Sequence, residues 1–170
     1  MRVTDKHVLF WGEEFSNFHP APIHYEENGI KYFFPTSEHM FMWQKAKHFG
    51  DEFIANTILN VEHPKDAKKL GRKVQNFNND EWAKVRYDKM LLAVSLKFSQ
   101  NAELKSVLLS DEFKNKHFVE ASPFDEIWGI GYDEYHINAD DETKWKGLNL
   151  LGKCLDEVRN NLINKESNDN

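Results

Sequence analysis

Hydrophobic residues near the start of the chain alternate with polar ones in the way that β-strands do. The segment 8–11 (VLFW) predicts one short strand, and the segment 23–34 predicts two more. Between these two lies Asn28-Gly29, a dipeptide that tolerates positive φ at both turn positions, so the sequence predicts a β-hairpin. The preceding segment GEEFSNFHPAP is irregular and must run over the surface or line a cleft, because its backbone groups lack regular partners.

From Pro35 onward the apolar positions recur every three to four residues, which predicts helices. Thr36 or Ser37 can cap the first helix, which runs through Phe49. Further helices are expected at 51–59, 64–76, 80–99, 101–110 and 145–163. Residues 111–144 predict a short strand (FVEAS) and an acidic loop with glycines. The pattern therefore predicts an α+β fold, mostly helical, with a small N-terminal β-sheet.

Length and composition fit one domain over residues 1–163, followed by a polar, disordered tail over residues 164–170. With 40% hydrophobic residues, the chain has enough apolar material for a core. No apolar run is long enough to span a bilayer, and the start is too polar for a signal peptide, so we expect a cytoplasmic protein without a membrane partner. Cys154 lies at helical spacing among leucines, which favours a buried thiol over a nucleophile.

The formal net charge of −6 argues against a protein that works by coating nucleic-acid backbones. A basic run at 65–73 still allows a local basic pocket, although a solvated helix face is the simpler interpretation. The eight histidines show no metal-ligand spacing and there is no cysteine cluster, so neither a metal nor another cofactor is expected. Walker, GxSxG and GxGxxG motifs are also absent from the sequence.

Glu38 and Lys45 form the first candidate pair for catalysis. They are seven residues apart on the helix that follows Pro35, so at about 100° per residue they share one face. The alternative is that Glu38 is a first-turn carboxylate favoured by the helix dipole and that Lys45 is an ordinary exposed lysine.

The second candidate is the segment SPFDEIWGIG at 122–131. Asp125 and Trp128 lie there in a loop that ends in two glycines, of which Gly129 is the first. Glycine lets a backbone approach a ligand closely, and a tryptophan in a rigid turn can stack on a base. The tryptophan could equally fill the core.

Five blocks of sequence together resemble the NADAR, or YbiA-like, family. They are, in order, FWGEEFSNFHPAPI, PTSEHMFMWQKAKHFGD, AKKLGRKV, EASPFDEIWGIG and KGLNLLGKCLDEVR. The resemblance covers nearly the whole chain and implies the α+β, YbiA-like fold. The loop 132–144 looks like a variable insertion and leaves ligand specificity open.

The resemblance implies an N-glycosidase, a hydrolase that cleaves the bond between ribose C1 and a base amine. Its substrate would be a phosphoribosylamino-pyrimidine of riboflavin biosynthesis, or guanine in nucleic acid that carries ADP-ribose. Glu38 and Lys45 would then be the catalytic pair, and Asp125 with Trp128 would belong to the pocket wall.

Recognition of a phosphorylated ribose or of ADP-ribose needs cations and hydrogen-bonding groups. We expect Arg72 and Arg86 to bind phosphate, although each could instead pair with a carboxylate, such as Asp125 for Arg86. Asn17 and Asn149 are candidates for the ribose hydroxyls, and each could as readily satisfy a buried backbone group.

Two other function classes stay open at this stage. A non-catalytic module that binds ADP-ribose or another nucleotide would keep the aromatic and basic residues but would not need a positioned Glu38 and Lys45. A small interaction protein without a ligand would need none of them. The sequence does not identify the released base or the oligomeric state.

Overall fold

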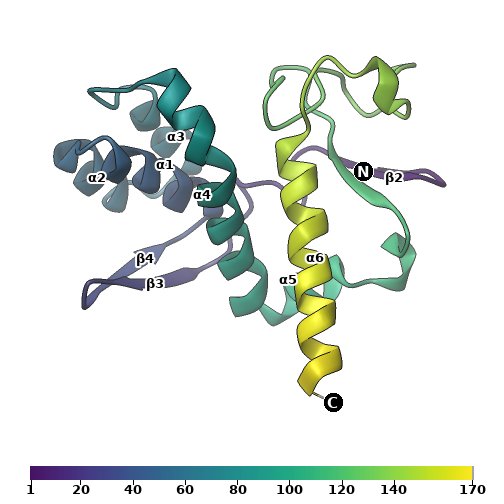
Figure 1. Cartoon of the computed structure of the whole chain (residues 1–170), viewed down its shortest axis with the longest axis horizontal. Helices are drawn as coiled ribbons and strands as arrows, with labels where there is room; N and C mark the ends of the chain where they lie inside the picture. The colour runs from purple at the N-terminus through teal and green to yellow at the C-terminus, as the bar shows by residue number, and fades with distance from the viewer. Residues whose placement is uncertain (170) are drawn as a thin grey trace. The chain divides into compact units, whose positions relative to one another are not determined.

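The structure, a computed structural model, describes residues 1–169, and Asn170 lies outside the described range. The chain forms two compact units (Figure 1). The central unit is Asn17–Asn101, and the terminal unit combines Met1–Ser16 with the chain from Ala102 onward. The prediction of a single domain over residues 1–163 came from the length of the chain and stays a prediction.

The central unit contains four helices, each of which the periodicity predicts. They are α1 (Ser37–His48), α2 (Glu52–Leu59), α3 (Pro64–Gly71) and α4 (Asn79–Gln100). Side-chain oxygens start three of them: Thr36 accepts from the amide of His39, Asp51 from that of Ile54, and Asn78 from that of Glu81. Helix α3 ends five residues earlier than expected, and Asn76 beyond it adopts a φ of 62°.

A β-hairpin, as predicted, completes the central unit. Its strands are β3 (Ile23–Glu27) and β4 (Ile30–Phe34), joined through Asn28 and Gly29 with φ values of 53° and 76°. Inward-facing residues of the hairpin and the helices form one apolar cluster: Ile23, Phe34, Met40, Trp43, Ala46, Ile54, Ala55, Ile58, Ala67, Val74 and Ala93.

A close approach between α1 and α3 depends on Gly71. A Cβ atom built on this glycine would collide with the sulfur of Met42, which lies on α1 between Glu38 and Lys45. The missing side chain lets α3 pack against the face of α1 that carries the candidate catalytic pair.

The terminal unit is built on a three-stranded sheet with the order β1-β2-β5. Strand β1 (Arg2–Val3) pairs antiparallel with β2 (His7–Phe10), and β2 pairs parallel with β5 (His117–Glu120). All four residues of β2 are buried, as expected for a strand covered on both faces. The sequence predicted β2 and β5 but not their pairing.

The other elements of the terminal unit follow in the second half of the chain. They are α5 (Ala102–Leu108), the 3-10 turns η1 (Asp111–Phe113) and η2 (Glu142–Lys144), and α6 (Leu150–Asp169). Helix α6 packs on β5 at Gly152, where a Cβ atom would collide with the carbonyl oxygen of Phe118. Cys154 is buried on α6, as expected for a core thiol.

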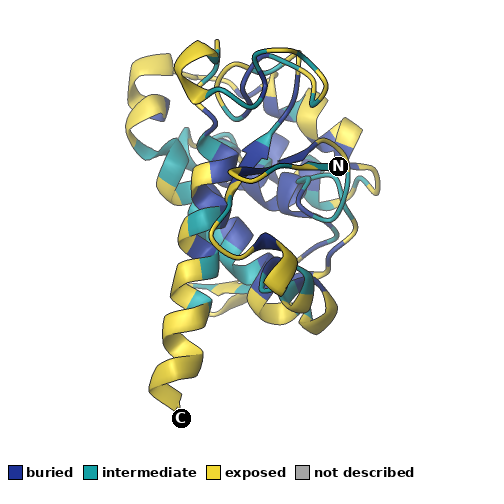
Figure 2. Ribbon diagram, turned by 90° about the vertical axis from the view of Figure 1, so that its right-hand side faces the viewer, coloured by how far each residue is buried: buried dark blue, intermediate teal, exposed yellow. Residues whose placement is uncertain are grey.

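The expected disordered tail is helical as far as the structure describes it, which corrects that prediction. Helix α6 continues to Asp169, and its last turns are exposed (Figure 2). No proline or glycine follows Gly152 to end the helix, and Lys105 of α5 forms a 3.0 Å salt bridge with Glu166. A polar composition alone therefore did not stop the helix.

Six α-helices and two small sheets within residues 1–169 confirm the α+β, mostly helical class. In that range no helix combines the length and the apolar character that crossing a membrane requires.

Replacing Gly152 by Ala should destabilise the protein, although alanine is the better helix former by about 1 kcal/mol. The new methyl group would collide with the Phe118 carbonyl and the Asn149 side chain. We expect a net loss of about 1–3 kcal/mol in the free energy of unfolding, measured by denaturant titration. The control is Asn161→Ala, at an exposed position of α6, which should change stability by less than about 0.5 kcal/mol. A Gly152→Ala variant more stable than the parent would contradict this account of the packing.

Candidate functional site

Glu38 and Lys45 lie on α1 as the heptad spacing predicts. Glu38 is buried, with 7% of its surface exposed, and Lys45 is half-buried. The Glu38 carboxylate is near enough to raise the pKa of Lys45 by its charge. The structure therefore rules out the alternative that Lys45 is a fully exposed lysine, and it places an acid and a base together on one helix.

The surroundings of Lys45 lower the pKa of its ammonium group from the ordinary 10.5. Burial is the largest cause, and the positive charge of Arg72 acts in the same direction, against the opposing effect of Glu38. The Lys45 Nζ also lies 4.5 Å from the centre of the Phe77 ring, whose π face favours the charged form. A lowered pKa increases the fraction of neutral amine, which is the nucleophilic form.

Asn17 fixes the first turn of α1 from the preceding loop. Its backbone carbonyl accepts from the amide of Glu38 at 3.1 Å, and its Oδ1 accepts from the Ser37 hydroxyl at 2.8 Å. Its Nδ2 donates to the sulfur of Met90 at 3.4 Å. Asn17 thus positions Glu38, and its role as a ribose contact stays a prediction.

Thr36 and His39 form a buried network that the sequence analysis did not identify. Nε2 of His39 lies 3.0 Å from the Val61 carbonyl, and its Nδ1 lies 2.7 Å from the Thr36 hydroxyl. Burial lowers the pKa of His39, so the ring is neutral, with Nε2 donating to Val61 and Nδ1 accepting from Thr36. The sequence did carry a signal for this network, because a histidine follows Glu38 directly at the start of a capped helix.

Arg72 and Arg86 lie on different helices of the central unit. Arg72 is exposed at the end of α3, next to Gly71, and Arg86 is half-buried on α4. Neither guanidinium forms a salt bridge with another residue of Asn17–Asn101. Arg72 is brought close to Lys45, as its effect on the pKa of that lysine shows.

In the terminal unit, Asp125 organises the loop that carries Trp128. Its Oδ1 accepts from the amides of Ile127 at 2.9 Å and of Trp128 at 2.8 Å, which is the geometry of an Asx turn. Trp128 is half-buried in this turn. The loop is therefore held rigidly by hydrogen bonds, as stacking on a base would require.

Gly129 and Asn149 have structural contacts that the sequence analysis left open. A Cβ atom at Gly129 would lie 2.9 Å from the carbonyl oxygen of Glu120. The close approach that this glycine allows is therefore an approach by the backbone of Glu120. The buried Asn149 side chain accepts from the Glu120 amide and donates to the Phe118 carbonyl, each at 3.0 Å. Asn149 therefore satisfies the backbone of β5, the alternative considered above, and ligand contacts of both residues stay predictions.

Each unit thus gathers one group of the expected site residues. The central unit brings together Asn17, Glu38, Lys45 and Arg72. In the terminal unit, Asp125 binds the amide of Trp128, and the carbonyl of Gly129 accepts from the amide of Asn149 at 3.1 Å. No group of three or more His, Cys, Asp or Glu side chains within residues 1–169 could hold a metal ion.

Comparisons with known proteins identify the family and the fold of the chain. A sequence model of the NADAR domain matches residues 9–163. The N-glycosidase R617 of Acanthamoeba polyphaga mimivirus is 39% identical over 165 residues, which cover 92% of this chain and 96% of that protein. The chloroplastic riboflavin biosynthesis protein PYRR of Zea mays is 31% identical over 159 residues, which cover 88% of this chain and 23% of that protein. The NMR structure of the E. coli protein YbiA is 31% identical and superposes with a TM-score of 0.73, covering 97% of this chain and 89% of that one.

Replacing Arg72 by Gln should raise the pKa of Lys45, because it removes a positive charge that disfavours the ammonium form. The neutral fraction of Lys45 at any given pH should fall accordingly. The pKa can be followed by NMR titration of protein labelled in its lysine side chains, with Lys45→Arg to assign the signal. Lys73→Gln makes the same charge change at the adjacent exposed position and should leave the titration nearly unchanged. An unshifted Lys45 signal in Arg72→Gln would show that Arg72 does not influence this amine.

Proposed function

Because the chain belongs to the NADAR family, and is a hydrolase of the N-glycosidase class like its named relatives, we propose that it cleaves the bond between ribose C1 and a base amine. The observation that carries the proposal is the pairing of buried Glu38 with half-buried Lys45, whose pKa is lowered, on one face of α1. A module that only binds nucleotides has no need of this pair.

Two substrate classes share the required bond. One is a phosphoribosylamino-pyrimidine intermediate of riboflavin biosynthesis, which the name of the maize relative supports. The other is guanine in nucleic acid that carries ADP-ribose. In either case Arg72 and Arg86 would bind phosphate, and Trp128 would stack on the base. Because these substrates are formed inside cells, the proposal includes a cytoplasmic location.

The chemistry begins with opening of the sugar. An exocyclic amine is a poor leaving group from an intact ribose ring, but protonation of the ring oxygen opens the ring to an iminium at C1. The neutral amine of Lys45 then adds to C1, and the base amine leaves with a proton. The product is a Schiff base between Lys45 and the sugar, which water hydrolyses to free lysine and the released ribose phosphate or ADP-ribose.

Glu38 transfers the protons in these steps. It delivers one to the ring oxygen and accepts one from the attacking amine or water. Its position in the first turn of α1 stabilises the carboxylate through the helix dipole, whereas its burial favours the protonated form. The rival mechanism is direct attack by water that Glu38 activates, in which Lys45 supplies only charge.

Replacing Glu38 by Gln should abolish turnover while substrate binding persists, because the amide keeps the shape but cannot transfer a proton. We expect a loss in kcat of at least about 10²-fold, the usual contribution of general acid–base catalysis. The assay measures ribose release from phosphoribosylamino-pyrimidine and from guanine-ADP-ribosylated DNA. Glu62→Gln, at an exposed position of the same unit, is the matched control and should retain activity. A loss smaller than about tenfold in Glu38→Gln would argue against proton transfer by this residue.

The lysine mechanism predicts a covalent intermediate that hydride reagents can trap. Cyanoborohydride added during turnover should reduce the Schiff base and leave a sugar phosphate on Lys45, which peptide mass spectrometry would locate. Lys45→Arg should neither form the adduct nor turn over substrate, because the guanidinium stays protonated. Lys47→Arg is the control on the same helix and should still be trapped at Lys45. An active Lys45→Arg enzyme, or turnover without any adduct, would leave water attack as the mechanism.

A further inference from the structure

A cavity lies in the central unit, and Trp43 and Lys47 contribute to it from the side of α1 opposite the catalytic pair. At about 100° per residue, Trp43 and Lys47 point roughly 140–180° away from Glu38. The cavity has a volume of about 560 Å³ and lies between the hairpin, α1 and α4. This volume is within the range of about 300–1,000 Å³ that small-molecule sites have in proteins. None of its lining residues belongs to the candidate catalytic group.

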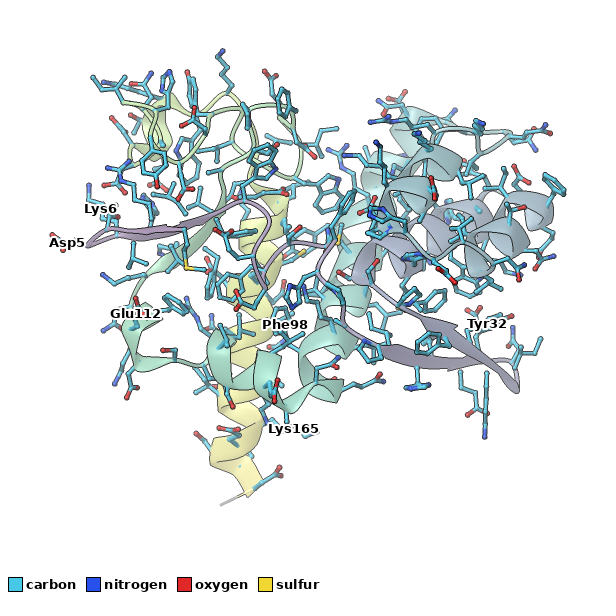
Figure 3. The ribbon with its side chains drawn as sticks, turned by 180° about the vertical axis from the view of Figure 1, so that it is seen from behind. Asp5, Lys6, Tyr32, Phe98, Glu112 and Lys165 are labelled. Atoms are coloured by element: carbon cyan, nitrogen blue, oxygen red, sulfur yellow. The ribbon has the colours of Figure 1, made fainter. Side chains whose placement is uncertain are left out.

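Aromatic side chains form one wall of this cavity. Trp43 is buried at its base, with its ring centre 4.6 Å from that of Tyr32 and 6.1 Å from that of Tyr25. Both tyrosines come from the hairpin and are half-buried, so part of each ring faces solvent (Figure 3 labels Tyr32). Flat rings that are fixed by a buried neighbour are suited to stack on a planar ligand.

Two of the three basic side chains in the cavity lining already contact carboxylates of the protein. Lys47 forms a 2.8 Å salt bridge with Glu52, and His48 lies 3.0 Å from a carboxylate oxygen of Glu81. Lys89 is the third basic residue of the lining and forms no salt bridge with another residue of Asn17–Asn101. An anionic ligand would therefore find one available cation here.

The lining also contains three side chains that can accept hydrogen bonds: Glu27, Asp88 and Gln44. Glu27 and Asp88 line the cavity without a salt bridge to any residue of Asn17–Asn101, and Glu27 receives only a long 3.5 Å bond from the Tyr25 hydroxyl. Gln44, also in the lining, is held by a 2.8 Å bond from its Nε2 to the Lys89 carbonyl, and its amide oxygen is of the acceptor type. A ligand that matches these groups is flat and rich in N–H donors.

We propose that this cavity binds a planar nitrogen heterocycle with an exocyclic amino group, of the aminopurine or aminopyrimidine class. The ring stacks against Tyr25 and Tyr32, and its amino group donates to Glu27 or Asp88. A ring N–H donates to Oε1 of Gln44. The site is separate from the catalytic face, so it binds its ligand without cleaving it.

Guanosine and inosine provide the first test, because they differ only in the exocyclic amino group. Isothermal titration calorimetry with the wild-type protein should show guanosine binding about tenfold more tightly, the effect of one hydrogen bond to a charged acceptor. Equal affinities, or no binding of guanosine at millimolar concentration, would overturn the proposal. Guanosine monophosphate is tested on the Arg72→Gln, Arg86→Gln double variant, which lacks the proposed phosphate contacts of the catalytic site. There it should bind no more tightly than guanosine, and a much tighter monophosphate would show that the cavity is an anion site instead.

Variants then locate the bound guanosine. Glu27→Gln combined with Asp88→Asn keeps the size of both side chains and should weaken guanosine binding about tenfold. The matched control, Glu26→Gln with Glu62→Gln, removes two exposed carboxylates outside the cavity lining and should bind like the wild type. Trp128→Ala should also leave guanosine affinity unchanged. If Trp128→Ala abolishes binding and the cavity variant does not, guanosine occupies the proposed catalytic site and the second site does not exist.

Discussion

The hydroxyl of Thr36 accepts from the amide of His39 and donates to the ring of the same histidine, and this pair of bonds starts helix α1. The neutral His39 ring is held in turn by the Val61 carbonyl. From the other side, the backbone carbonyl of Asn17 accepts a hydrogen bond from the amide of Glu38. The first turn of α1 is therefore fixed from two directions, and the buried Glu38 has little freedom to move. Every later feature of the candidate chemistry depends on this rigid start, because Lys45 follows two turns further along the same helix.

The environment of Lys45 is a balance between burial and charge. A fully buried lysine with no partner would be neutral but would also be costly to fold, whereas a lysine in a close ion pair would stay protonated. Here burial and Arg72 lower the pKa, while Glu38 and the Phe77 ring act in the opposite direction. Lys45 is therefore more easily deprotonated than an exposed lysine, although Glu38 and the Phe77 ring favour its ammonium form. The lowered pKa is the property that the proposed lysine mechanism requires, because the neutral amine is the nucleophilic form.

The parts of the structure that the sequence predicted well are those that local chemistry decides. Asn28-Gly29 specifies the hairpin turn, Thr36 specifies the start of α1, and the spacing of Glu38 and Lys45 places them on one face. Pairing between β2 and β5 was missed because the strands are more than 100 residues apart and neither local sequence specifies which strand it pairs with. The side chain of Asn149 was ambiguous for the same reason, since its partners on β5 are known only from the fold.

Charge distribution bears on which substrate class the central unit can accept. The net charge of −6 would repel a polyanion at long range, but at physiological ionic strength such repulsion is screened within about 8 Å. The charges near the candidate site therefore matter more for substrate binding than the net charge. Helix α3 and the residues after it expose several cations: Lys65, Lys68, Lys69, Arg72 and Lys73. Among these cations, Arg72 is the one whose charge lowers the pKa of Lys45, which is why we propose it as the phosphate contact nearest to the sugar. The remaining lysines are exposed in the same segment, and they are available to the backbone of a nucleic acid if the proposed substrate is of that class.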